Sequence, residues 1–167
     1  GYGNVSWTNS FAANPSISHY TLYLDAQLSN QTAPEAISFG TSHTINGVYD
    51  PFKLQCDFKD TGLWEVWDGA NATWHSTSIT CDPSQFPSGT WVHLSIDFER
   101  AANNQMQYQQ FTIGSDASST VPTTYPLNLT FGASSESDSV EFHITEGGNY
   151  IETPYSLYVD KMMLVAF

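Results

Sequence analysis

Positively charged residues are scarce in this sequence. The 167-residue chain has 4 lysines and arginines against 17 aspartates and glutamates, a formal net charge of −13. Such a surface repels nucleic-acid phosphates and anionic lipid, so we expect neither nucleic acid nor a membrane surface as a partner. It also disfavours polyanionic polysaccharides unless calcium bridges the two. Neutral glycans, metal ions and other proteins are the partners that remain.

Long apolar runs are missing as well. None reaches the roughly 18–20 residues that span a bilayer, so we expect no membrane insertion. The chain opens with GYGNVSWT, without the charged and apolar regions of a signal peptide, and we interpret it as a processed mature protein or an excised domain. Its length suits one domain, and we expect residues 1–167 to form a single β-sandwich domain.

Only two cysteines are present, Cys56 and Cys81. Both lie near expected strand ends, and we expect a disulfide, which would remove chain entropy worth roughly 3–4 kcal/mol. The alternative is two unrelated buried thiols; a zinc pair is disfavoured because no CxxC or HxxxH spacing accompanies them. Few lysines and many Ser, Thr, Asn, Gln and aromatic residues favour a secreted or cell-surface location. Four asparagines of the sequence match the N-glycosylation pattern, and we expect them as possible glycosylation sites: Asn4, Asn30, Asn71 and Asn128.

No convincing amphipathic helix appears, and apolar residues recur with a period of two. HYTLYLDAQL (19–28), WVHLSIDF (91–98) and VEFHIT (140–145) alternate in this way, which is typical of strands with one buried face. About eleven such segments, separated by Gly, Pro, Asn and Asp turns, predict an all-β fold, a two-sheet antiparallel β-sandwich or jelly roll. We expect surface loops at TSHTINGVYDP (41–51) and SDASSTVPTTYP (115–126).

Three tryptophans lie close together in TGLWEVWDGANATWHSTSIT (61–80). Alternation places Trp64 with Val66 in the core and Trp67 on the polar face beside Glu65. An indole on that face could stack on a pyranose ring or cover a sheet edge or an interface. The side of Trp74 stays undecided, because a bulge at the preceding turn would reverse it.

Two segments resemble a known family. FPSGTWVHLSIDFERAANNQMQYQQFTIG (86–114) resembles a hairpin of concanavalin A-like, laminin-G-type sandwiches, and YSLYVDKMMLVAF (155–167) is similar to their last strand. Most of the chain from Tyr20 onward looks like uncharacterised domains of secreted soil-bacterial proteins. Those domains often have a second histidine where Val92 stands here and an asparagine where Ala26 stands. The resemblance implies a fold and says little about function.

Such sandwiches include glycosidases and lyases, but the matching catalytic patterns are absent. Glu65 and Asp68 of WEVWD are three residues apart and on opposite faces, where retaining or inverting hydrolysis needs a facing pair. Arg100 is the only arginine, and no Gln-x-His or GxSxG is present. We therefore expect no catalytic residues, although whether the protein is an enzyme stays open.

Our leading interpretation is a secreted, non-catalytic, lectin-like carbohydrate-binding module for a neutral glycan. Alternation suggests one outward face carrying the ligand-binding residues Tyr23, Asp25, Trp67, Trp91, His93, Asp97 and His143. Calcium is a candidate cofactor, because similar sandwiches often hold it through loop carboxylates. Asp160 and Asp25 are the candidate ligands.

Two other functions fit the same sequence. The first is a structural or assembly protein of the cell surface or of an extracellular filament, whose subunits self-associate through the terminal strands. The second is a glycoside hydrolase or lyase of the jelly-roll type.

Overall fold

Eleven strands and one 3-10 turn make up the part of the chain that the structure describes. The computed structural model describes residues 4–11, 14–116, 121–133, 140–147 and 153–167, with the backbone alone for 4–11 and 140–147. The elements are β1 (Asn4–Phe11), β2 (His19–Leu28), β3 (Ala36–Ile45), β4 (Val48–Asp57), β5 (Leu63–Asp68), β6 (Thr73–Thr80), η1 (Pro83–Gln85), β7 (Trp91–Arg100), β8 (Gln105–Ser115), β9 (Thr123–Gly132), β10 (Val140–Gly147) and β11 (Leu157–Ala166).

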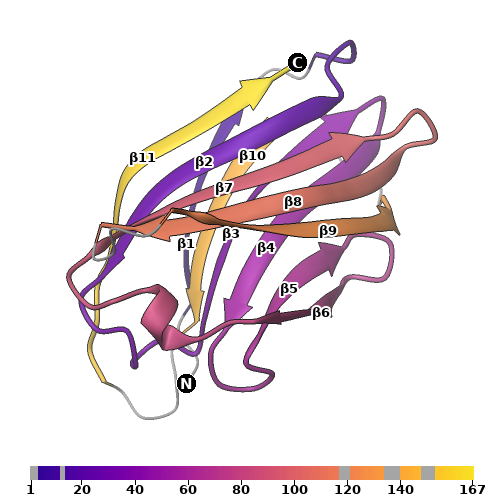
Figure 1. Ribbon diagram of the computed structural model, residues 1–167. Coiled ribbons are helices and arrows are strands. Elements are labelled where there is room, and N and C mark those ends of the chain that lie inside the picture. Colours follow the sequence, from indigo (N-terminus) through magenta and orange to yellow (C-terminus); the bar gives the residue numbers. More distant parts are fainter. Residues whose placement is uncertain (1–3, 12–13, 117–120, 134–139, 148–152) are drawn as a thin grey trace.

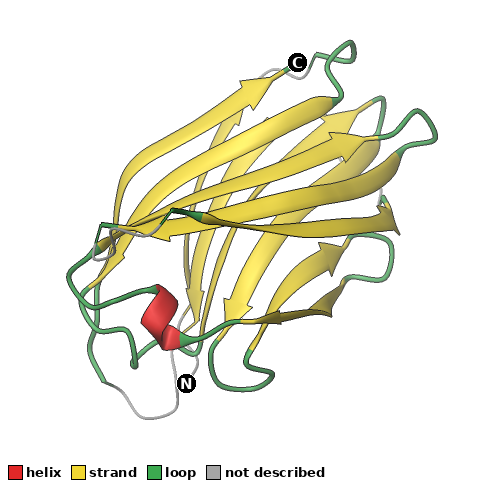
Figure 2. Ribbon diagram, viewed as in Figure 1, coloured by secondary structure: helices red, strands yellow, loops and turns green. Residues whose placement is uncertain are grey.

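The strands form two antiparallel sheets that pack face to face (Figure 1), with η1 as the short turn drawn in red in Figure 2. The six-stranded sheet has the order β1-β10-β3-β4-β5-β6, and the five-stranded sheet has the order β11-β2-β7-β8-β9. The predicted all-β, two-sheet antiparallel sandwich is confirmed.

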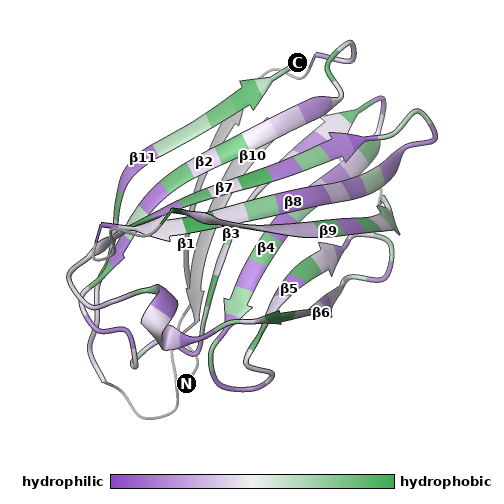
Figure 3. Cartoon of the chain, in the orientation of Figure 1, coloured by the Kyte–Doolittle hydropathy of each residue, from purple (hydrophilic) through white to green (hydrophobic). Residues whose placement is uncertain are grey.

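Alternation along the strands builds the core. Bands of hydrophobic and hydrophilic residues follow one another along β5 and β7 (Figure 3), and the inward set of β7 consists of Val92, Leu94, Ile96 and Phe98. Trp64 is fully buried, as predicted, with its ring centroid 4.7 Å from that of Phe111. Because each strand contributes every second residue, both outward faces of the sandwich are left polar.

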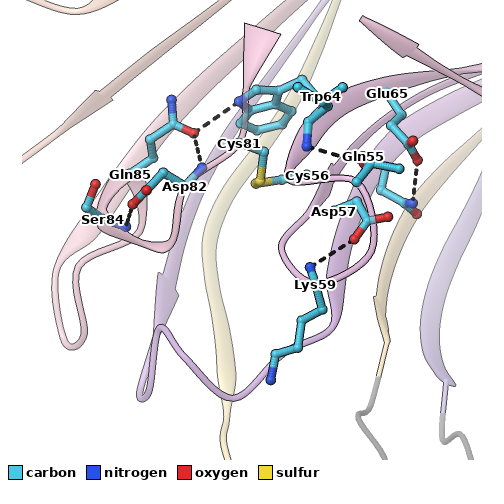
Figure 4. Close-up of a disulfide and its surroundings, with 12 residues drawn as sticks. Gln55, Cys56, Asp57, Lys59, Trp64, Glu65, Cys81, Asp82, Ser84 and Gln85 are labelled. Carbon is cyan, nitrogen blue, oxygen red and sulfur yellow. Dashed lines mark hydrogen bonds between the residues drawn. A yellow bond between two sulfur atoms is a disulfide. The ribbon is translucent and has the colours of Figure 1, made fainter.

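Cys56 and Cys81 form the predicted disulfide, with their Cα atoms 5.4 Å apart (Figure 4). It ties β4 to the segment that follows β6. Gln85 lies in the same corner, where its Oε1 accepts a hydrogen bond from Trp64 Nε1 at 3.1 Å. The disulfide and this bond fix the end of the β5–β6 hairpin to the core.

The prediction of a surface loop at residues 41–51 is wrong. The segment forms the ends of β3 and β4, joined by the two-residue turn Asn46-Gly47, whose φ angles are +54° and +75°. Two positive φ angles define a type I′ hairpin turn, which matches the twist of the strands that it joins. The loop predicted at 115–126 is shorter than expected, because β8 continues to Ser115 and β9 begins at Thr123.

The hydroxyl of Tyr108 joins the two sheets at a gap in the β4–β5 ladder. These strands pair at only three positions, from Leu54–Val66 to Cys56–Trp64. Beyond them Tyr108, reaching across from β8, accepts a hydrogen bond from the Lys53 N–H at 2.9 Å and lies 3.0 Å from the Trp67 carbonyl oxygen. One phenol from the opposite sheet therefore bonds to backbone groups of both β4 and β5.

Candidate functional site

The predicted ligand-binding residues lie on two opposite faces of the sandwich. Five of them are on the outward face of the five-stranded sheet, which we call the ionic face: Tyr23, Asp25, Trp91, His93 and Asp97. Trp67 is on the outward face of the six-stranded sheet. His143 is in β10, whose side chains lie outside the described residues; its backbone pairs with Gly40 in the same six-stranded sheet. The expected single platform is therefore divided in two.

On the ionic face, the carboxylates are already paired. His93 lies between two of them, with Nδ1 2.7 Å from Asp25 Oδ1 and Nε2 2.9 Å from Asp116 Oδ1. The hydrogen bonds to Asp116 and Asp25 raise the pKa of His93 above its usual value, which favours an imidazolium that donates to both. Lys161 Nζ lies 3.5 Å from Asp25 Oδ2. Both oxygens of Asp25 thus face cationic or donor groups within the protein.

Other polar side chains of this face are also paired with one another. Asp97 accepts hydrogen bonds from Thr21 and from Gln110 Nε2, the latter at 2.9 Å. Thr112 and Thr124 bond to one another at 2.8 Å. A ligand binding here would have to displace these contacts.

The outward face of the six-stranded sheet carries a tryptophan pair. Trp67 and Trp74 are cross-strand neighbours in the β5–β6 hairpin, with ring centroids 5.1 Å apart and planes at 72°. Lys53 Nζ lies 5.4 Å from the centroid of the Trp67 ring. The undecided side of Trp74 is thereby resolved, and the two half-buried indoles form one aromatic surface.

A nearly buried carboxylate adjoins the tryptophans. Glu65 is 5% exposed. Its Oε2 accepts a hydrogen bond from Gln55 Nε2 at 3.1 Å (Figure 4), and its Oε1 accepts one from Ser76 Oγ at 2.7 Å. Both donors are neutral groups, and each carboxyl oxygen has a second lone pair that could accept from a ligand hydroxyl.

We call this surface the indole face and define it by Lys53, Gln55, Glu65, Trp67, Trp74 and Ser76. Sequence patterns identified Glu65 and Trp67 as neighbours but missed Gln55 and Ser76. Their contribution depends on the register that aligns Gln55 with Glu65 and Glu65 with Ser76 across three strands. Alternation within single strands does not contain that information.

The turn before Trp74 is built by Asp68. Its Oδ1 accepts hydrogen bonds from the N–H groups of Ala70 at 3.0 Å and Asn71 at 3.3 Å, and its Oδ2 accepts one from Asn71 Nδ2 at 2.7 Å. Asp68 therefore acts in shaping the hairpin, and its carboxylate is on the opposite side of β5 from Glu65.

A separate polar cluster is enclosed between the sheets. Asp50 has no exposed surface, and among the described residues neither of its carboxyl oxygens has a hydrogen-bond partner. Burial raises the pKa of Asp50 to about 7 and lowers that of the neighbouring His43 to about 4. The Tyr20 hydroxyl bonds to His43 Nε2. Because Asp50 and His43 are closed off from solvent, we assign this cluster a role in stability and not in ligand binding.

The calcium candidates are neighbours in the β2–β11 pair. Asp160 lies in the bulge between Val159 and Lys161, opposite Ala26 and Asp25. Asp25 lies beside two cationic groups, His93 and Lys161, with which a cation at this carboxylate would compete, and calcium stays a prediction. Among the described residues, no group of three or more His, Cys, Asp or Glu is arranged to hold a metal ion.

The glycosylation sites also stay predictions. Asn30 and Asn71 use their side chains in turns, through Asn30 Oδ1 and Asn71 Nδ2. Asn128 is exposed on β9. Asn4 is in β1, outside the described side chains.

Neither a family model nor a curated protein sequence matches the chain. Among solved structures, it is similar to an alginate lyase of polysaccharide lyase family 7, at 10% identity and a TM-score of 0.29, covering 94% of this chain and 63% of the lyase. It is also similar to a native glycosidic hydrolase, at 13% identity and a TM-score of 0.33, covering 95% of this chain and 86% of the hydrolase. A third similar structure is a polysaccharide lyase of family 18, at 8% identity and a TM-score of 0.32, covering 87% of this chain and 74% of that lyase. Scores of this size carry no inference about function.

Within the described ranges, no helix is long and apolar enough to cross a bilayer.

Proposed function

We propose that the protein is a secreted carbohydrate-binding module that holds a neutral glycan on its indole face. The observation that carries this proposal is the Trp67–Trp74 pair beside the half-satisfied carboxylate of Glu65. Indole rings offer apolar surface to the C–H face of a sugar, and a fixed carboxylate accepts hydrogen bonds from its hydroxyl groups. The two kinds of group must lie side by side to bind one ring, and here they do.

The charge of the chain supports a neutral ligand. A net charge of −13 opposes the approach of a polyanion, and the indole face adds Glu65 to that field. Lys53 is already placed over the Trp67 ring. The disulfide supports an oxidising, extracellular compartment.

Retention on polysaccharides tests the proposal. The folded protein would be run against soluble and insoluble glucans, xylans, mannans and galactans, in calcium and in EDTA. We expect retention by at least one of them, lost in a Trp67→Ala/Trp74→Ala variant and kept in Trp91→Ala, which alters the ionic face. Retention that survives the double substitution, or no retention by any of these glycans, would overturn it. Loss in EDTA alone would add calcium to the site.

A second candidate, self-assembly, is favoured by a different surface. β11 is an edge strand of its sheet, and exposed apolar side chains lie along it and its neighbour: Tyr158, Met163 and Tyr23, which are 51%, 52% and 42% exposed. Free edges next to apolar side chains invite strand addition by another subunit. Light scattering after size exclusion over a hundredfold range of concentration distinguishes the two functions, because an assembling subunit would show a rising mass.

A further inference from the structure

A lateral cleft opens on one long side of the sandwich. β6 ends the six-stranded sheet and β9 ends the five-stranded sheet, so both free edges face this side (Figure 1). Near one end the edges meet, where the Ala70 N–H donates to the Gly132 carbonyl at 3.1 Å. Toward the other end lies a cleft of about 550 Å³, lined by residues 78–80, by Asp82, Ser84 and Gln85 around η1, and by Tyr125 of β9.

A bulge in β6 shapes the wall of this cleft. Leu63 pairs with Thr80 and Glu65 pairs with Ser76, so two steps along β5 oppose four along β6. Thr77 holds the extra residues in place: its Oγ1 donates to the Trp64 carbonyl at 2.7 Å and accepts from the Ile79 N–H at 3.1 Å. Bulges that are held in this way re-aim side chains, and here they direct Ser78 and Thr80 to the cleft.

The opposite wall is fixed by the core. Tyr125 stacks on Phe111 with centroids 5.0 Å apart, and Phe111 in turn contacts Trp64. Gln85 Oε1 accepts hydrogen bonds from Trp64 Nε1 and from the Asp82 N–H, both at 3.1 Å. The cleft is therefore preformed, which lowers the entropy cost of binding.

The polar groups of the cleft keep unused capacity. Both hydrogen bonds that the described residues give to the Gln85 side chain use Oε1, so its two N–H donors are available. Asp82 Oδ1 accepts from the Ser84 N–H at 2.7 Å, and Oδ2 adds a further acceptor. The hydrogen bonds from Ser84 also lower the pKa of Asp82, which keeps it ionised. A carboxylate, an amide, several hydroxyls and one aromatic ring are the groups that recognise a sugar.

We infer that this lateral cleft is a second saccharide site, which holds a sugar unit of a neutral glycan between Tyr125 and the Asp82–Gln85 turn. The choice of ligand class rests on the proposed function; the site itself does not share residues with the indole face. Ser76 of the indole face and Ser78 of the cleft are two residues apart on β6, so the two sites adjoin. The volume falls in the range of small-molecule pockets, about 300–1,000 Å³.

The tryptophan indole signals distinguish the two sites. In ¹⁵N-labelled protein, Trp64 Nε1–H reports on the cleft through its bond to Gln85, and Trp67 and Trp74 report on the indole face. The probes are cellohexaose, xylohexaose, mannohexaose and laminarihexaose, each titrated separately. We expect at least one of them to shift Trp64 Nε1–H and the Gln85 side-chain amide in a saturable way.

A Gln85→Glu variant supplies the decisive comparison. Glutamate keeps the oxygen that Trp64 and the Asp82 N–H require, and it is the ordinary residue of a capping box, so the fold is retained. It removes the two N–H donors and should weaken binding in the cleft by about tenfold. Gln31→Glu is the matched control, because Gln31 Oε1 likewise accepts a backbone N–H, from Ser88, and does not line the cleft.

Each pattern of shifts decides between the sites. Saturable shifts at Trp64 Nε1–H and the Gln85 amide support the cleft if the Trp64 titration moves to about tenfold higher sugar concentration in Gln85→Glu and is unchanged in Gln31→Glu. Shifts at Trp67 and Trp74 alone overturn the cleft and leave the proposed function standing. Shifts at the cleft alone, with the indole face silent, support the cleft and refute the indole face as the site. If none of these signals shifts with any of the four hexasaccharides, both the cleft site and the proposed function are overturned.

Discussion

The two outward faces of this sandwich arise from the same alternation and differ in what their polar groups do. On the ionic face, Asp25 is paired with His93 and Lys161, and Asp97 with Thr21 and Gln110. On the indole face, the donors that the described residues offer Glu65 are the neutral side chains of Gln55 and Ser76, and two tryptophans lie beside it. A polar, aromatic composition therefore does not identify a binding face. Unused hydrogen-bonding capacity next to apolar surface does.

The largest effect is expected at Asp50, a buried carboxyl without a hydrogen-bond partner among the described residues. Burial raises the pKa of Asp50 from 3.8 to about 7, so the folded protein binds an extra proton between those values. Its stability therefore falls as the pH rises from about 4 through about 7. Relative to Asp50→Asn, the wild type should lose roughly 4 kcal/mol over this interval.

Urea denaturation of both proteins between pH 4 and pH 9 measures this difference. His43 works in the opposite sense, because its lowered pKa costs stability as the pH falls below about 6.5. Comparing the two proteins at each pH cancels the contribution of His43. A difference that does not change with pH would show that Asp50 is hydrated in solution.

The next largest effect concerns the tryptophans. Trp67→Ala/Trp74→Ala removes two stacking surfaces and should weaken glycan binding by about 100-fold, near 3 kcal/mol. Tyr23→Ala/Trp91→Ala also removes two aromatic side chains, from the ionic face, and should change the affinity less than about twofold. Isothermal titration with the retained glycan measures both. Equal losses in the two double variants would erase the distinction between the faces.

Glu65→Gln sharpens the comparison at a single charge. The substitution keeps the shape and removes the carboxylate, so we expect binding about tenfold weaker and a nearly unchanged melting temperature. Glu99→Gln is the matched control, since Glu99 also accepts from a glutamine, Gln109, at 3.5 Å on the other sheet. A Glu65→Gln protein that binds as tightly as the wild type would remove the carboxylate from the site.

The smallest effect belongs to His93. The carboxylates of Asp116 and Asp25 raise its pKa, so its contribution to stability is complete below about pH 6.5 and is lost as the pH rises through the higher folded pKa. His93 is exposed to solvent, and His93→Asn should cost less than about 1 kcal/mol at pH 5.5 and almost nothing at pH 9. Thermal melts at the two pH values provide the test, and an equal cost at both would show that the ion pairs contribute nothing.

Alternation predicted the fold because every second residue of β2 and β7 faces the core. The number of strands and the burial of Trp64 followed from the same pattern, whereas the disulfide followed from the presence of only two cysteines, both near expected strand ends. It did not predict which sheet a strand joins, and so Trp67 and Trp91, both correctly placed outward, were assigned to one platform although they lie on opposite sheets. Strand order is decided by long-range packing, which no local pattern encodes.

The hairpin at Asn46-Gly47 was missed for a different reason. The polar residues Ser42, His43 and Thr44 of β3 are all buried and resemble a loop in sequence. Asn-Gly is nevertheless the strongest short-range hairpin motif, and giving it more weight would have located the turn. One of the two carboxylate partners of His93 was missed too, because Asp116 lies just beyond the end of β8, in a segment interpreted as loop.

The phenol of Tyr108 makes the β5–β6 hairpin a dependent part of the opposite sheet. β5 pairs with β4 at only three positions, so few backbone hydrogen bonds hold the hairpin to the rest of its sheet. Farther along, Lys53 of β4 and Trp67 of β5 are connected through the hydroxyl of Tyr108 in β8. Opening of the hairpin therefore breaks contacts in both layers at once, and the amide of Lys53 should exchange with solvent as slowly as the amides of the core strands. The tryptophan surface is thus positioned from beneath, by the sheet that it does not belong to.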